Sequence, residues 1–263
     1  MNLNGATALI TGANGGLGEA IATHLSKAGA KLVLTGRRKD ALEPIAQKLG
    51  AKMIIADLAE RKDVERIHAE AGDIDVLVAN AALPASGLFL DFEPAFLDRA
   101  LDVNLRAPIV MAQPFAKKMA ERKRGHLVFI SSISGKVAAL GTTLYSGTKF
   151  GMRGFALALR EELAYSQVGV STIFPGFIRD AGMFAKTGVK LPAVMGTRSP
   201  DDVGRAVVKA ITKDIAEIEV AAFEQRLGSF LAGISPGLVG WMQRQGGGHQ
   251  LATEMASAQK GIR

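Results

Sequence analysis

The sequence predicts a single α/β domain in which a doubly wound, seven-stranded parallel sheet carries helices on both faces. Short apolar runs rich in β-branched residues alternate with longer stretches whose apolar residues recur at helical spacing. A glycine-rich turn, TGANGGLG, separates the first such run from the first helical stretch. No Pro/Ser-rich linker or abrupt change in composition divides the 263 residues, so we expect one domain with a common core.

The individual elements follow from these patterns. Seven apolar runs are expected to form strands, at residues 6–10, 31–34, 52–55, 75–78, 126–130, 170–174 and 217–220. Six stretches with helical spacing lie between them, at residues 17–28, 40–48, 62–70, 93–122, 143–166 and 200–212. Because helical stretches separate most of the strands, the connections are crossovers that return the chain in the same direction and make the sheet parallel.

Two segments break this alternation. Residues 180–198 are rich in Gly, Met, Lys and Pro and follow a strand directly, where open α/β sheets bind ligands, so we expect a substrate lid there. The tail after Val220 mixes apolar residues with Gly and Pro, which suits a subunit contact, a wall of the substrate cleft or a segment on a membrane surface. The apolar residues of the tail are Phe223, Leu227, Phe230, Leu231, Leu238, Trp241 and Met242.

Composition narrows the function classes. The chain is 48% hydrophobic and 22% charged, has no apolar run of membrane-spanning length and begins without a signal-peptide pattern, so we expect a cytoplasmic protein. It has no cysteine and only four scattered histidines, so we expect no metal site. The net charge of +7 comes from short basic groups without an aromatic stacking platform, which favours an anionic nucleotide ligand over a nucleic-acid partner.

The glycine-rich turn spans Thr11 to Gly18 and places glycines at positions 12, 16 and 18. Glycine lets the backbone approach a phosphate closely, and a helix N-terminus directs its free amides at an anion. A plain strand-to-helix turn also uses glycines, and the spacing differs from GxGxxG. The strand-turn-helix context nevertheless favours pyrophosphate binding.

The residues after the second strand, LTGRRKD, indicate which dinucleotide is bound. Folds that bind NAD usually place a carboxylate there for the ribose hydroxyls, whereas this chain has Gly36 followed by Arg37 and Arg38. A carboxylate repels a 2′-phosphate and a guanidinium pairs with it, so NADP is favoured over NAD, unless both arginines are merely solvated. Asp57 and Asn80 follow the next two strands and are expected to line the same crevice.

A tyrosine and a lysine supply candidate proton chemistry. Tyr145 and Lys149 are four residues apart, so on a helix they share one face, and the ammonium is expected to lower the phenol pKa from about 10. Ser132 directly follows the run HLVFIS and therefore lies at the carboxyl edge of the sheet. Asn104 lies inside a long helical stretch, where an amide is a mediocre helix former and needs a specific partner.

These motifs together resemble the short-chain dehydrogenases/reductases, in the branch with a TGxxxGxG turn and a Tyr-x-x-x-Lys pair. The resemblance runs from about residue 3 to residue 220, and several motifs occur in the family's order and at its spacing. They are Thr11 to Gly18, Asp57, Asn80 with Ala81, Asn104, Ser132, Tyr145, Lys149 and Pro175 with Gly176.

The resemblance implies a Rossmann fold in which residues 1–130 mainly bind the dinucleotide and residues 131–263 carry the catalytic part. Tyr145 would act as general acid/base on the carbonyl oxygen and Ser132 would hydrogen-bond that oxygen. Lys149 would bind the nicotinamide ribose and depress the tyrosine pKa, while Asn104 would hold a water of a proton relay. The implied nucleotide contacts are Thr11, Gly12, Asn14, Gly16, Leu17, Gly18, Arg37, Arg38, Asp57, Leu58, Asn80, Ala81, Tyr145, Lys149, Pro175, Gly176 and Ile178.

The sequence departs from the family pattern at two places. The usual Asn-Asn-Ala-Gly reads Ala-Asn-Ala-Ala, so Ala82 stands where glycine is common. Asp180 stands where a threonine after Pro-Gly often bonds the carboxamide. The backbone near Ala82 and the orientation of the cofactor near Asp180 are therefore open.

The function expected from the sequence is NADP-dependent interconversion of a ketone or aldehyde and an alcohol, with a small-molecule, apolar substrate. A lid built from Met183, Phe184 and the region of Leu191 and Pro192 would cover that substrate. The alternatives are a nucleotide-sensing or regulatory protein on the same fold and a ketoacyl-thioester reductase. Members of this family are usually homodimers or homotetramers that pack the two long helices at residues 93–122 and 143–166, and the apolar positions Met152, Phe155, Leu159 and Leu163 suit either such a contact or the sheet.

Overall fold

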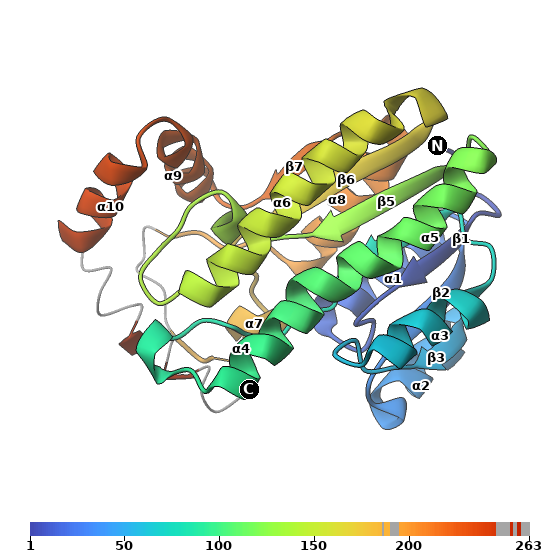
Figure 1. Cartoon of the computed structure of the whole chain (residues 1–263), viewed down its shortest axis with the longest axis horizontal. Coiled ribbons are helices and arrows are strands. Elements are labelled where there is room, and N and C mark those ends of the chain that lie inside the picture. Colours follow the sequence, from blue (N-terminus) through green and yellow to red (C-terminus); the bar gives the residue numbers. More distant parts are fainter. Residues whose placement is uncertain (186, 190–194, 246–252, 255–256, 259–263) are drawn as a thin grey trace.

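The computed structural model describes residues 1–185, 187–189, 195–245, 253–254 and 257–258 (Figure 1). One parallel sheet of seven strands runs through it, in the order β3-β2-β1-β4-β5-β6-β7. The chain therefore moves outward from β1 to β3 and then crosses to the other side of β1, as a doubly wound sheet does. The strands are β1 (Thr7–Ile10), β2 (Lys31–Gly36), β3 (Lys52–Ile55), β4 (Val76–Ala79), β5 (Gly125–Ile130), β6 (Val168–Pro175) and β7 (Glu217–Val220). The predicted fold class is confirmed.

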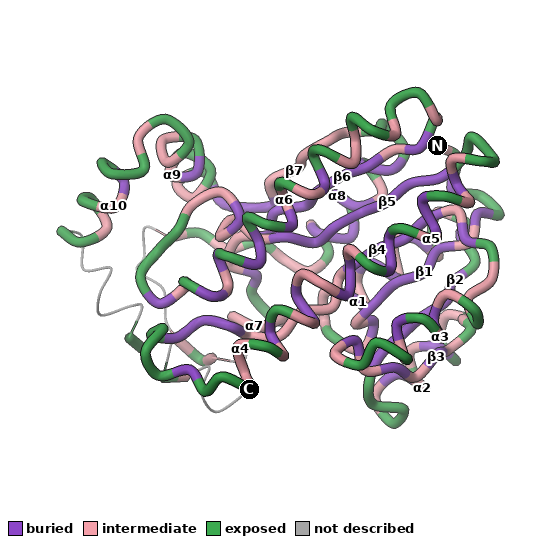
Figure 2. The backbone as a smooth tube through the Cα atoms, viewed as in Figure 1, coloured by how far each residue is buried: buried purple, intermediate pink, exposed green. Residues whose placement is uncertain are grey.

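Helices cover both faces of the sheet and produce two core layers. One layer packs α1 (Gly16–Lys27), α2 (Lys39–Leu49) and α8 (Pro200–Lys213) against the strands. The other layer packs α3 (Arg61–Ala71), α5 (Ala107–Glu121) and α6 (Thr143–Leu163) against the opposite face. The central strands are buried on both faces, which Figure 2 shows as purple tubes between the helices. Continuous apolar runs such as HLVFI are what such two-sided burial requires.

The predicted helix at residues 93–122 is not continuous. It forms α4 (Pro94–Leu101), a π-helical turn η2 (Asp102–Arg106) and then α5. Pro108 has no N–H to donate to the carbonyl of Asn104 four residues earlier, so the α-helical ladder is interrupted there. A π-turn accommodates such an interruption and often lies at a functional site.

The apolar positions of α6 divide between the core and the surface. Met152 is buried, and Phe155, Leu159 and Leu163 pack against the core layer beneath the sheet. Phe150 and Leu157 lie on the outer face of the helix and are exposed. The four positions that the sequence left open therefore face the sheet within the chain.

The chain continues beyond β7 into two helices that stand apart from the sheet. These are α9 (Phe223–Ile234) and α10 (Pro236–Gln245), and they lie beyond the carboxyl ends of β5 to β7 (Figure 1). Shorter elements complete the described part: η1 (Phe89–Asp91), η3 (Ile133–Gly135), η4 (Ala164–Ser166) and α7 (Gly182–Ala185).

A buried histidine in β5 makes stability depend on pH. His126 is 2% exposed, and its Nε2 lies 2.8 Å from the Ser171 hydroxyl, which donates its own proton to the Ile215 carbonyl oxygen at 2.6 Å. Nε2 must therefore donate. Burial lowers the pKa of His126 to about 4, against the opposing charge of Asp214. The folded pKa lies below the unfolded pKa, so this contribution is present above pH 6.5 and is lost as the pH falls toward 4.

We expect the wild-type protein to lose about 2 kcal/mol of unfolding free energy between pH 7 and pH 5 through this histidine. His126→Gln retains a donor near Ser171 and removes the titration, so its loss over the same interval should be smaller by that amount. Urea unfolding at the two pH values measures the difference. Equal losses in both proteins would contradict the assignment.

Candidate active site

A single cleft of about 1820 Å³ crosses the carboxyl edge of the sheet. Nearly every residue that the sequence predicted for the site lines it, which brings positions from all parts of the chain together. These residues are Gly12, Asn14, Gly16, Leu17, Gly18, Arg37, Arg38, Asp57, Leu58, Asn80, Ala81, Ser132, Tyr145, Lys149, Pro175, Gly176 and Ile178. Thr11 and Asn104 do not line it. Sequence reasoning missed further lining residues, among them Gly15, Thr35, Gly36, Leu83, Arg99 and Val103.

The glycine-rich turn forms a cradle that side chains would fill. Gly12 has φ +63°, and a Cβ there would lie 2.8 Å from the Cα of Ala81. A Cβ on Gly18 would lie 2.3 Å from the Gly12 carbonyl oxygen. Helix α1 begins after Gly15, and no described side chain caps its first turn. The first amides of α1 therefore border the cleft without side-chain cover, which fits the pyrophosphate of a dinucleotide.

Thr11 has a structural place rather than the predicted place in the cleft. It is 2% exposed, and its hydroxyl oxygen accepts hydrogen bonds from the backbone N–H groups of Asn80 at 3.0 Å and Ala81 at 3.1 Å. The Asn80 amide in turn donates to the carbonyl oxygen of Thr11 at 2.9 Å and to that of Gly12 at 3.2 Å. Thr11 and Asn80 thus fasten the loops after β1 and β4 to each other.

Positive charge gathers at the end of the cleft near β2 and β3. Arg37 and Arg38 line the cleft, are exposed, and have no ion-pair partner within the described residues. Asp57 is paired with Arg99 of α4, whose guanidinium donates to it at 2.6 Å. Burial alone would raise the pKa of Asp57, but the hydrogen bonds from the Ala59 N–H and Arg99, with the charges of Arg99 and Arg37, hold it below its usual range. Nothing local in the sequence links Arg99 to a carboxylate 42 residues away.

Three of the four predicted catalytic side chains meet in the cleft, Ser132 from the turn after β5 and Tyr145 and Lys149 from α6. Lys149 is 3% exposed, and its Nζ donates to the Ile130 carbonyl oxygen at 3.0 Å. The same Nζ lies 5.5 Å from the centre of the Tyr145 ring. The Ser132 hydroxyl is hydrogen-bonded to the Tyr145 phenol. The Ser134 N–H donates to the Ser132 oxygen at 3.1 Å and fixes the serine at the start of η3.

The predicted fall in the tyrosine pKa is wrong for the protein without nucleotide. Burial raises the pKa of Tyr145 to about 12, and only the Ser132 hydrogen bond acts in the opposite direction. Burial also lowers the pKa of Lys149 to about 8. Removing water from both groups disfavours the phenolate and the ammonium, and this cost exceeds their mutual attraction. The phenol is therefore protonated near neutral pH, which is the form that donates a proton.

Asn104 lies outside the cleft lining and holds the backbone of Leu83, which lines the cleft. It is 1% exposed and lies in the π-turn η2, where its Oδ1 accepts from the Leu83 N–H at 2.6 Å and its Nδ2 donates to the Leu83 carbonyl oxygen at 3.1 Å. The expectation that this amide needs a specific partner is met by the backbone of residue 83. Its part in a water relay stays a prediction.

The two departures from the family pattern have different outcomes. Ala82 lines the cleft and is not among the residues with positive φ, so its methyl group fits without backbone strain. Asp180 has φ +67°, and its exposed carboxylate lies 3.3 Å from the Arg179 guanidinium, outside the cleft lining. Ala181, Gly182 and Met183 line the cleft at this point instead.

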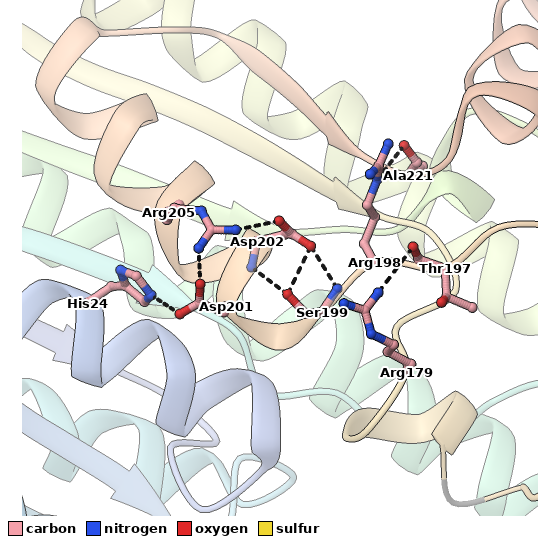
Figure 3. Close-up of polar contacts among 9 residues, drawn as sticks. All are labelled: His24, Arg179, Thr197, Arg198, Ser199, Asp201, Asp202, Arg205 and Ala221. Carbon is pink, nitrogen blue, oxygen red and sulfur yellow. Dashed lines mark hydrogen bonds and ion pairs between the residues drawn. The ribbon is translucent and has the colours of Figure 1, made fainter.

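Figure 3 shows how the two ends of the predicted lid are held together beside α8. Ile178 and Arg198 form an isolated parallel bridge, in which the Arg179 N–H donates to the Arg198 carbonyl oxygen at 2.9 Å. The Arg198 guanidinium donates to the Ala221 carbonyl oxygen at 3.3 Å, which ties the bridge to the end of β7. Met183 and Phe184 line the cleft as expected, whereas Leu191 and Pro192 lie outside the described residues.

The start of α8 next to this bridge is fixed by its own contacts. Ser199 and Asp202 form a reciprocal capping box, with the Ser199 N–H donating to the Asp202 carboxylate at 2.8 Å. Asp201 contacts both Arg205 and His24 of α1 (Figure 3). The predicted lid therefore leads into α8, whose first turn is held by the capping box and by the contacts of Asp201.

The described residues lack the features of two other classes of protein. No helix there combines the length and the apolar content that crossing a membrane requires. No group of three or more His, Asp or Glu side chains in the described part of the chain is arranged to hold a metal ion.

Comparisons with known proteins agree with the geometry. The family model described as short chain dehydrogenase matches residues 6–191. An uncharacterized oxidoreductase of Staphylococcus aureus (strain N315) is 34% identical over 213 residues, which is 78% of this chain and 90% of the relative.

Solved structures share the fold over most of their length. A metagenomic short-chain oxidoreductase in complex with NADP is 32% identical, with a TM-score of 0.71 over 84% of this chain and 98% of that chain. The bulky-bulky ketone specific alcohol dehydrogenase from Comamonas testosteroni is 26% identical, with a TM-score of 0.76 over 89% of this chain and 94% of that chain. A 3-ketoacyl-(acyl-carrier-protein) reductase from Brucella melitensis complexed with NADH is 26% identical, with a TM-score of 0.73 over 83% of this chain and 97% of that chain. The chain therefore belongs to the short-chain dehydrogenase/reductase family, oxidoreductases that act on CH–OH groups with a nicotinamide cofactor.

Proposed function

We propose that the protein is an NADP-dependent reductase of ketones or aldehydes, with Tyr145 as its proton donor. The observation that carries this proposal is the meeting of Tyr145, Ser132 and Lys149 in one cleft with the glycine-rich turn. A protein that only senses nucleotides has no need of a protonated phenol that is hydrogen-bonded to a serine inside the cleft. NADP in a solved relative supports the nucleotide, although another relative holds NADH.

Each residue of the site has its own role in the proposed reaction. The amides of the first turn of α1 would hold the pyrophosphate of the cofactor, whose nicotinamide would supply the hydride when bound. Tyr145 donates its phenolic proton to the substrate oxygen, and the Ser132 hydroxyl hydrogen-bonds the same oxygen. Lys149 lines the cleft beside Tyr145 and contributes positive charge near the oxygen that changes its charge.

Arg37 is expected to select the phosphorylated nucleotide. It lines the cleft beyond β2 without an ion-pair partner among the described residues, so its guanidinium is free to pair with a 2′-phosphate. Arg37→Ala should weaken NADPH binding about 10- to 100-fold, the range expected for a lost charged hydrogen bond, and should change NADH binding far less. Fluorescence titration of both nucleotides measures the two affinities.

Lys39 offers the matched control for this experiment. It is an exposed cation two residues further along the chain that does not line the cleft, so Lys39→Ala should leave both affinities unchanged. Equal losses for NADPH and NADH in Arg37→Ala would defeat the phosphate pairing.

The activity itself is tested by NADPH oxidation over a panel of ketones and aldehydes, with NADH in parallel.

We further propose a homodimer or homotetramer built on α5 and α6, because Val110, Phe150 and Leu157 expose apolar side chains on these helices. Light scattering of the purified protein gives the number of subunits, and a monomer would contradict this part of the proposal.

A further inference from the structure

The cleft extends beyond the residues expected to hold the dinucleotide and the reacting carbonyl. It continues past Tyr145 between residues 137–140, which follow η3, and the two C-terminal helices α9 and α10. Its volume of about 1820 Å³ exceeds the roughly 300–1,000 Å³ of ordinary ligand pockets. Helices α9 and α10 begin after residue 191, where the match to the family model ends. We propose, on the basis of the proposed function, that α9 and α10 form a channel that selects an uncharged substrate with a long apolar chain.

The walls of this channel are joined to one another. Leu231 of α9 and Val239 of α10 line it on one side, and Val137 and Ala138 line it on the other. Val239 is 8% exposed and is the buried residue of α10. The Gln243 amide of α10 donates to the Ala138 carbonyl oxygen at 3.4 Å and bridges the two sides. The tail therefore forms a wall of the cleft, which was one of the three alternatives that its sequence allowed.

Helix α9 also holds the lid. The Gln225 side chain accepts from the Phe177 N–H at 3.2 Å and donates to the Gly196 carbonyl oxygen at 2.8 Å. Phe177 precedes the predicted lid at residues 180–198, and Gly196 lies near its end. Glu224 accepts from the Gly196 N–H at 2.6 Å. The first turn of α9 thus fixes the channel wall relative to both ends of this segment.

The chemistry of the lining indicates an uncharged, apolar ligand. Among the described residues that line the channel beyond Tyr145, Glu224 and Arg244 carry the charges. Backbone hydrogen bonds hold the pKa of Glu224 below its usual range, so it stays ionised, and Arg244 carries the opposite charge. The two charges offset each other, so the channel has no net charge that would attract a charged ligand. At the outer end Leu140 and Met242 both line the channel and are about half exposed, at 46% and 50%. An apolar chain longer than the channel can pass between these two side chains into solvent.

Gly228 leaves space in the middle of the channel wall. It lines the cleft within α9, and a Cβ there would meet no heavy atom within 4 Å. Glycine inside a helix costs about 1 kcal/mol relative to alanine, and no packing contact in the described chain explains the choice. A ligand chain that occupies this space beside α9 accounts for the glycine at position 228. Gly233 on the same helix is also free of neighbours, but it lines a separate surface pocket and not the cleft.

The experiment measures kcat/KM with NADPH for 2-alkanones of increasing chain length, from 2-butanone to 2-dodecanone. In the wild type, kcat/KM should rise by up to about fourfold per added methylene while the chain fits the channel. Gly228→Phe fills the channel, so the ratio of kcat/KM for 2-decanone to that for 2-butanone should fall at least tenfold. Gly233→Phe adds the same side chain outside the cleft and should keep the wild-type ratio. A wild type that prefers the shortest ketones, or an unchanged ratio in Gly228→Phe, would overturn the proposal.

A binding measurement separates this proposal from the proposed function. Isothermal titration calorimetry with 2-decanone measures binding to the protein without turnover. Wild type that binds 2-decanone, and loses this binding in Gly228→Phe, but reduces no ketone of any length, would support the channel and refute the reductase. Absence of binding to the folded wild type would refute the channel, whether or not the protein reduces short ketones. Gly228→Leu, a smaller change with the same expected direction, replaces Gly228→Phe if the latter does not fold.

Discussion

Tyr145→Phe should reduce kcat for ketone reduction by about 100- to 10,000-fold, the usual contribution of a general acid. The substitution removes one oxygen and keeps the ring, so the packing beside Lys149 is retained. Burial raises the pKa of Tyr145 to about 12, so the wild-type phenol carries its proton at every pH at which the enzyme would be assayed. The variant lacks that proton, and no other described phenol reaches the cleft.

The affinity for NADPH should change little in the same variant, because the pyrophosphate contacts come from other elements and Lys149, which would bind the nicotinamide ribose, is unchanged. Tyr165→Phe is the matched control, since Tyr165 is the other tyrosine of the chain and is 97% exposed. NADPH oxidation and a nucleotide titration measure the two quantities. A Tyr145→Phe protein with a nearly normal rate would show that another group supplies the proton.

Lys149→Met should abolish most of the activity and, at the same time, stabilise the protein. Burial lowers the pKa of Lys149 to about 8, whereas the unfolded chain has the ordinary value near 10.5. Below pH 8 the ammonium therefore costs about 3 kcal/mol in the folded state. Methionine has a similar shape without the charge, and the Ile130 carbonyl oxygen loses a donor worth about 1 kcal/mol. The net gain is about 2 kcal/mol, or roughly 5 °C in Tm.

The sign of this effect can be checked by pH. The folded pKa is depressed, so the cost of the buried ammonium is fully present below pH 8 and disappears as the pH rises through 10.5. The difference in Tm between Lys149→Met and wild type should therefore be largest at pH 7 and small at pH 10. A variant that is less stable than wild type at pH 7 would mean that the lysine is held by interactions stronger than its desolvation.

The sequence was sufficient for the sheet and for most of the site. Strands that are buried on both faces leave a strong apolar signal, as in HLVFI, and the site residues follow those strands directly. Gly12, Asp57 and Ser132 each follow a strand closely, and the strands end at one edge of the sheet, so the three residues line the same cleft. The order of several motifs along the chain indicated the family, which no single motif would have done.

The errors have physical reasons that no local pattern contains. The direction of the Tyr145 pKa depends on how much water the fold removes from the phenol, which spacing to Lys149 does not reveal. The support that Thr11 gives to the loop after β4, through two backbone hydrogen bonds that its hydroxyl accepts, was also not visible in the sequence, and its contact with the nucleotide stays a prediction. The pairs Asp57 with Arg99 and Gln225 with Gly196 join distant segments, so neither was visible before folding.

The bridge between Ile178 and Arg198 bears on how this protein can diversify. It joins the two ends of the predicted lid and is hydrogen-bonded to Ala221 at the end of β7. A change in the length of the chain between the two bridge residues therefore need not move the sheet. Lengthening a loop whose ends are already fixed costs only about 0.6 kcal/mol for each doubling of its length. We therefore expect insertions and deletions between these two residues to accumulate over evolution and to change the surface beside the cleft while Tyr145 keeps its position.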